Sequence, residues 1–144
     1  MEAIIIVLAV ILDQLSKYFV VKYLKPIGTF PVIKKFFYLT YIQNRGAAFG
    51  IMQNKTLFFI IITTIVGIAL IYSIVKIPGS TAYKFTLSMI LGGAIGNLID
   101  RIRLGYVVDF VDFRVFPAVF NLADSFIVVG SFILAYFIIF KGIK

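Results

Sequence analysis

Carboxylates gather in one short part of a chain that has few of them. The 144 residues include only six acidic side chains, and three of these lie in "GYVVDFVDFRVFPAVFNLADSFIVVG" (105–130), with Asp100 just upstream. Asp109 sits in the apolar setting "YVVDF", and Asp124 sits in "NLADS" where a long apolar run begins. If the loop between them folds back, the two carboxylates share one proton and can act as base and acid. Such a pair could activate water for hydrolysis of a peptide bond.

The absence of two residue types excludes several other kinds of catalytic site. Histidine and cysteine are both absent, which removes the usual general base, thiolate nucleophiles and the commonest metal ligands. A Mg²⁺ site made of Asp100, Asp109 and Asp112 stays open, as does proton-coupled transport through aspartates within membrane spans. Asp124 is also a plausible helix cap, and Asp112 could be a spare carboxylate on an exposed turn. We expect no metal and no cofactor.

The composition indicates a membrane protein. Hydrophobic residues make up 62% of the chain and charged residues only 14%, whereas soluble domains are about half apolar and about a quarter charged. The net charge of +8 comes from basic residues scattered near the ends of apolar segments. That pattern favours contact with anionic lipid headgroups and argues against nucleic-acid binding.

Four apolar segments predict an α-helical integral membrane protein with a single domain over 1–144. Each segment is about long enough to span a bilayer, and four spans place both termini on the same side. A region at about 27–50, rich in aromatic and β-branched residues and bounded by Gly28 and "NRG", predicts a strand or hairpin outside the membrane. The expected spans are about 3–24, 56–75, 82–101 and 121–140.

Charged residues within the predicted spans are candidates for function because their burial in lipid is costly. Asp13 and Lys17 lie four apart on one helix face, as either a functional pair or a buried pair that fixes helix packing. Asn97, Asp100 and Arg101 also share one face, and an Asp beside an Arg should stay ionised. This second group suits substrate positioning or a salt bridge at a helix end.

Five sequence blocks, in order, resemble the lipoprotein signal peptidases (signal peptidase II). They cover nearly the whole chain, and together they are far more specific than any one block alone. The blocks are "DQLSK" (13–17), "NRGAAFG" (44–50), "GGAIGNLIDR" (92–101), "GYVVDF" (105–110) and "FNLADS" (120–125).

The resemblance implies a metal-independent aspartic endopeptidase of the bacterial cytoplasmic membrane, and we expect it to be a monomer. It would remove the signal peptide from diacylglyceryl-modified prolipoproteins, cutting before the lipidated cysteine. Asp109 and Asp124 would be the catalytic pair, with Asp13 and Lys17 as structural support. The residues that would support the site or contact substrate are Asn44, Arg45, Gly46, Asn97, Asp100, Arg101 and Asn121.

The family implies four transmembrane helices, a small extracytoplasmic β-sheet cradle and cytoplasmic termini. Counting Lys and Arg gives the opposite orientation, because most basic residues lie on the side of the predicted sheet. We follow the family, since several of those basic residues belong to a folded region and to site motifs. A proton-coupled transporter or binding protein, and a partner subunit of another enzyme, are the competing hypotheses.

Overall fold

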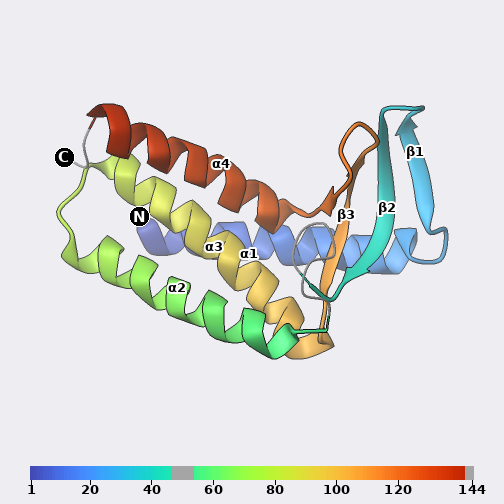
Figure 1. Ribbon diagram of the computed structural model, residues 1–144, viewed down its shortest axis with the longest axis horizontal. Coiled ribbons are helices and arrows are strands. Elements are labelled where there is room, and N and C mark those ends of the chain that lie inside the picture. The colour runs from blue at the N-terminus through green and yellow to red at the C-terminus, as the bar shows by residue number, and fades with distance from the viewer. Residues whose placement is uncertain (47–53, 142–144) are drawn as a thin grey trace.

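The computed structural model, described over residues 1–46 and 54–141, consists of long helices with a sheet across one end (Figure 1). Within these residues four helices are long and apolar enough to cross a membrane, and a four-stranded antiparallel sheet accompanies them. The predicted fold class, a four-span helical membrane protein with a small sheet, is confirmed. The helical ends nearest the two termini both lie at the end of the bundle away from the sheet (Figure 1). The helices are α1 (Glu2–Phe19), α2 (Thr56–Lys76), α3 (Thr81–Leu104) and α4 (Leu122–Tyr136), with π-helical turns η1 (Val20–Leu24) and η3 (Phe137–Lys141) extending α1 and α4.

Helix α3 is the centre of the bundle, and the other three helices pack against it. Small residues on α3 allow this close approach. A Cβ atom added at Gly96 would lie 2.5 Å from Oδ2 of Asp13 in α1, and one at Gly93 would lie 2.5 Å from the carbonyl oxygen of Ala123 in α4. Helix α2 is far more exposed than α3, as expected for a helix that faces lipid over most of its surface.

The sheet has the strand order β1-β2-β3-β4, formed by β1 (Thr29–Ile33), β2 (Phe37–Asn44), β3 (Val107–Phe113) and β4 (Val119–Phe120). Its first two strands come from the region predicted to be extended. Strands β3 and β4 come from the segment between the third and fourth spans. The central pairing sets Ile42 opposite Asp109 and Asn44 opposite Val107, with an irregularity between Leu39 and Ile42.

The sheet is anchored to the bundle through a small apolar core. Val20 and Leu24 of η1 pack against Val108 and Phe110 of β3. This contact holds β3 against the sheet end of α1, so that Asp109, between the two packed residues of β3, is carried to the end of the bundle. Asp112, expected on an exposed turn, instead lies within β3 and is buried. That expectation was wrong because the turn begins only after Phe113.

Candidate active site

Asp109 is buried at the junction of the sheet and the helices. Its side chain is 2% exposed. Asn121 donates from Nδ2 to its Oδ1 at 2.6 Å, and Asn44 donates from Nδ2 to its Oδ2 at 2.9 Å. The carboxyl group is therefore held by two amides, one from β2 and one from the residue that precedes α4.

Asp124 lies in the first turn of α4 and takes part in a capping box. Asn121 is the N-cap, accepting from the backbone N–H of Asp124 at 2.8 Å, while Oδ2 of Asp124 accepts from the backbone N–H of Asn121 at 3.2 Å. Asn97 of α3 donates from Nδ2 to Oδ1 of Asp124 at 2.7 Å. Asp124 is thus a partner of the cap, and Asn121 links it directly to Asp109.

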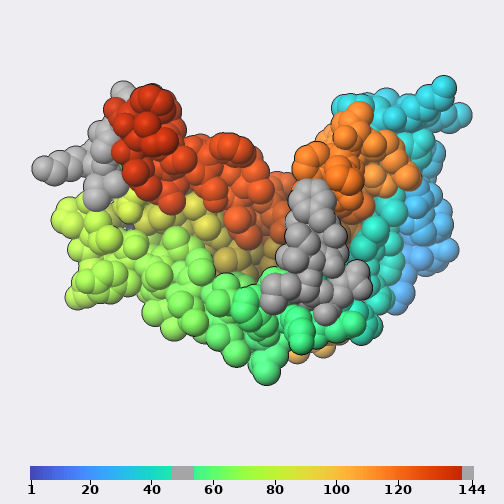
Figure 2. Space-filling model, viewed as in Figure 1, coloured from blue at the N-terminus to red at the C-terminus, as the bar shows by residue number. Residues whose placement is uncertain are grey.

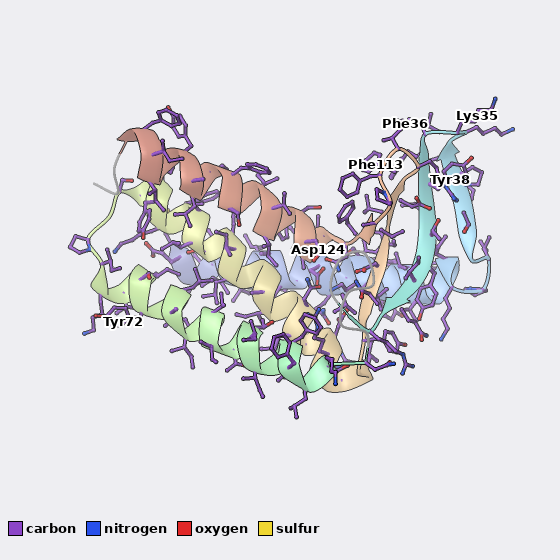
Figure 3. The ribbon with its side chains drawn as sticks, viewed as in Figure 1. Lys35, Phe36, Tyr38, Tyr72, Phe113 and Asp124 are labelled. Carbon is purple, nitrogen blue, oxygen red and sulfur yellow. The ribbon has the colours of Figure 1, made fainter. Side chains whose placement is uncertain are left out.

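Both aspartates line one pocket of about 180 Å³. Figure 2 shows the surface hollowed between α4 and the β3–β4 turn, and Figure 3 shows Asp124 at the sheet end of α4. The polar lining comes from residues of β2, α3, β3 and α4, and the apolar lining includes aliphatic side chains of α4. The lining residues are Asn44, Gly46, Asn97, Arg101, Val107, Asp109, Val119, Phe120, Asp124, Ile127 and Val128.

Burial and, to a lesser extent, the charge of Asp124 together raise the pKa of Asp109 from its ordinary 3.8 to about 7. The amide hydrogen bonds from Asn44 and Asn121 oppose this rise, since they favour the ionised carboxylate. A carboxyl group in this setting can hold a proton near neutral pH, while a neighbouring carboxylate accepts one. The arrangement can therefore perform acid–base chemistry without histidine.

Known proteins with similar sequences show which family the chain belongs to. Residues 5–140 match the family described as signal peptidase (SPase) II. The lipoprotein signal peptidase of Caldanaerobacter subterraneus subsp. tengcongensis is 68% identical over 99% of this chain and 98% of that protein. That of Halothermothrix orenii is 46% identical over 96% of this chain and 94% of that protein. The chain belongs to the signal peptidase II family.

A solved structure of a bacterial membrane enzyme, obtained by the in meso method at 1.9 Å resolution, has the same fold. It is 38% identical, with a TM-score of 0.86 over 98% of this chain and 94% of that one. The resemblance drawn from the five sequence blocks is confirmed, and with it the class of aspartic-type peptidase. Membership of the signal peptidase II family favours this class over the transporter hypothesis.

Behind the pocket, a buried ion cluster joins α1 and α3. Lys17 contacts Oδ2 of Asp13 at 2.8 Å and Oδ2 of Asp100 at 3.0 Å. The predicted Asp13–Lys17 pair is present, but Asp100 pairs with Lys17 rather than with its chain neighbour Arg101. The reason is geometric: the carboxylate of Asp100 turns toward α1 and β3, where it also accepts from the backbone N–H of Val108 at 3.0 Å.

Arg101 and Gly46 also line the pocket. Arg101 donates from Nη2 to the carbonyl oxygen of Gly46 at 3.4 Å, and its guanidinium lies over the ring of Phe59, 5.1 Å from the centroid. Arg45 is exposed and lies over Tyr106, outside the lining of the pocket. The rest of the "NRGAAFG" block, residues 47–50, lies outside the described residues.

The proposed Mg²⁺ ligands are not brought together. Asp100 pairs with Lys17, whereas Asp112 accepts from Thr40 Oγ1 at 2.7 Å and pairs with Arg114 at 3.3 Å. Among residues 1–46 and 54–141, no group of three or more acidic side chains is placed to hold a metal ion.

Sequence reasoning missed Gln14. Its Nε2 lies within hydrogen-bond distance of Asp13 Oδ2 at 3.2 Å, the carbonyl oxygen of Gly96 at 3.2 Å and Asp100 Oδ1 at 3.0 Å. A long polar side chain beside a charged pair in an apolar span was the signal that could have identified it. The apolar pocket residues Val119 and Phe120 were also missed. They reach the pocket because they form β4, which pairs with β3.

Proposed function

We propose that this chain removes the signal peptide from diacylglyceryl-modified prolipoproteins, with Asp109 and Asp124 as the catalytic pair. The observation that carries the proposal is the shared pocket in which Asn121 contacts both carboxyl groups. The pocket lies where α4 begins and the sheet meets the bundle, at the boundary of the spanning segments. A peptide bond just outside an apolar helix would reach that depth.

The chemistry follows from one proton shared between two carboxyl groups. The ionised carboxylate takes a proton from water while the water oxygen attacks the scissile carbonyl carbon. The protonated carboxyl group donates its proton to the carbonyl oxygen. The tetrahedral diol intermediate then collapses: the carboxyl group that took the water proton gives it to the leaving amine, and the other carboxylate takes a proton from a hydroxyl of the diol. The C–N bond breaks, one water is consumed, and the pair returns to its single-proton state.

The remaining residues support this reaction in proposed roles. Asn44, Asn97 and Asn121 hold the carboxyl groups in place. Arg101 and Gly46 border the pocket where substrate backbone would lie, and Arg45 would contact substrate or lipid outside it. The apolar lining of the pocket is suited to an apolar peptide with acyl chains attached.

We place the protein in the bacterial cytoplasmic membrane as a monomer surrounded by lipid. Its termini would face the cytoplasm, and the sheet and pocket would face the extracytoplasmic side. The support for this orientation is membership of the signal peptidase II family, since the count of Lys and Arg favours the reverse.

The test uses purified protein and a diacylglyceryl-modified prolipoprotein. Asp124→Asn should lower the cleavage rate by at least about a thousandfold, since it removes one member of an acid–base pair. The matched control is Asp112→Asn, which changes a buried carboxylate of β3 outside the pocket. Cleavage by Asp124→Asn at the rate of the control would remove Asp124 from the mechanism.

A further inference from the structure

Lys17 contacts other groups besides Asp13, its predicted ion-pair partner. Its side chain is 4% exposed, and its ammonium group contacts three acceptors. These are Asp13 Oδ2 at 2.8 Å, Asp100 Oδ2 at 3.0 Å and Asn97 Oδ1 at 3.0 Å. An ammonium group has three N–H donors, so each is committed to a separate partner.

The contact with Asn97 leads to the proposed catalytic pair. An ammonium group can only donate, so the oxygen of the Asn97 amide must face Lys17, and the amide nitrogen must face away. On that other side, Nδ2 of Asn97 donates to Oδ1 of Asp124 at 2.7 Å. We propose that Lys17 is a positioning residue that fixes the orientation of the Asn97 amide, and through it the carboxyl group of Asp124.

Helix packing alone does not account for this arrangement. Asp13 has its own link to the site, because its Oδ1 accepts from the backbone N–H of Ala123 in α4 at 3.0 Å. A pair that only joined helices would need no contact between Lys17 and Asn97. Without Lys17, the Asn97 oxygen would keep a single donor, Nδ2 of Asn121 at 3.1 Å. The amide could then turn its oxygen toward Asp124, where it repels an ionised carboxylate.

The inference rests on the proposed function and is tested by a double-mutant cycle on cleavage of the lipidated precursor. The variants are Lys17→Met, Asn97→Leu and the double variant. If Lys17 acts through Asn97, Lys17→Met should lower kcat by about tenfold or more with KM nearly unchanged. In the Asn97→Leu background, removal of Lys17 should then cause little further loss, because the amide it orients is gone.

Lys17→Met leaves two buried carboxylates without a cation, which could impair folding by itself. A second set of variants distinguishes this folding defect from the loss of positioning. The cycle is repeated with Asp100→Asn, so that Lys17→Met with Asp100→Asn keeps the net charge of the Asp13–Lys17–Asp100 cluster unchanged. All rates are divided by the folded fraction. If the fold-losses in rate from Lys17→Met and Asn97→Leu simply multiply in the double variant, both with and without Asp100→Asn, the inference is overturned. Lys17 would then have only a packing role. Normal cleavage by Asp124→Asn would instead defeat the proposed function, so the two failures are distinguishable.

Discussion

The chemistry of the site depends on one shared asparagine. Asn121 caps α4, accepts from the backbone of Asp124 and donates to Asp109, all with a single side chain. The local requirement for an N-cap therefore also fixes the relative positions of two carboxyl groups. Because the cap residue begins the helix, any shift of α4 moves Asp124 and the Asn121 amide together.

The raised pKa of Asp109 predicts how the cleavage rate depends on pH. A carboxyl group with a pKa of about 7 keeps its proton below that pH and loses it above. The pair then holds two negative charges and has no proton to donate, so the cleavage rate should fall about tenfold per pH unit above about pH 7. Initial rates between about pH 5 and about pH 9 measure this. A rate that is constant from about pH 6 to about pH 9 would contradict it.

The same shift predicts a change in stability. Between pH 3.8 and about pH 7 the folded chain holds a proton on Asp109 that the unfolded chain releases, so stability falls as the pH rises through that window. The Asp109→Asn variant cannot titrate there. Thermal unfolding midpoints of the two proteins should therefore diverge in favour of the variant as the pH rises.

The contact between α1 and α3 positions the ion cluster and Asn97. Gly96→Ala would place a Cβ atom 2.5 Å from Asp13 Oδ2, which forces the two helices apart or displaces the carboxylate. We expect a loss of about 1–3 kcal/mol in stability, as for other overpacked sites, together with slower cleavage. The thermal unfolding midpoint and the cleavage rate measure both effects.

Gly67→Ala is the matched control. Its Cβ atom would meet only Leu91 Cδ1, at 3.7 Å, which is ordinary van der Waals contact. Replacing a glycine within a helix should leave the protein as stable or raise its stability by up to about 1 kcal/mol. Equal effects of the two substitutions would show that the approach of α1 to α3 does not govern stability.

The elements also show what the sequence could predict. The spans can be recognised in the sequence because each is a long apolar run. Strand β3 cannot, because it is buried on both faces. Val107, Val108, Asp109 and Phe110 are all buried, so the strand lacks the alternation of apolar and polar residues that marks a half-exposed strand. Proximity in the chain favoured Arg101 as the partner of Asp100, but Lys17, brought there by the packing of α1 on α3, is the true partner.

The orientation of the molecule in the membrane can be tested with single cysteines, because the chain has none of its own. A single cysteine at Val115, which is 75% exposed in the turn between β3 and β4, reports the sheet end. A cysteine at Thr81, the exposed first residue of α3, reports the opposite end. In intact spheroplasts, a membrane-impermeant maleimide should label Val115→Cys and spare Thr81→Cys. The reverse pattern would support the orientation given by the Lys and Arg count.

The shape of the molecule fits its proposed task. Helices α3 and α4 and strands β2, β3 and β4 line the pocket. The sheet lies across that end of the bundle (Figure 1), so that a lipidated peptide could reach the pocket from the bilayer. The proposed roles of Asp109 and Asp124 rest on the pocket that both residues line.

The most direct measurement is the mass of the product made from a diacylglyceryl-modified prolipoprotein by purified protein in lipid nanodiscs. The wild type should release a fragment that begins at the lipidated cysteine, whereas Asp109→Asn should leave the precursor intact. A precursor without the lipid should be cut far more slowly. Release of the same fragment by Asp109→Asn at the wild-type rate would show that the cleavage does not need both aspartates.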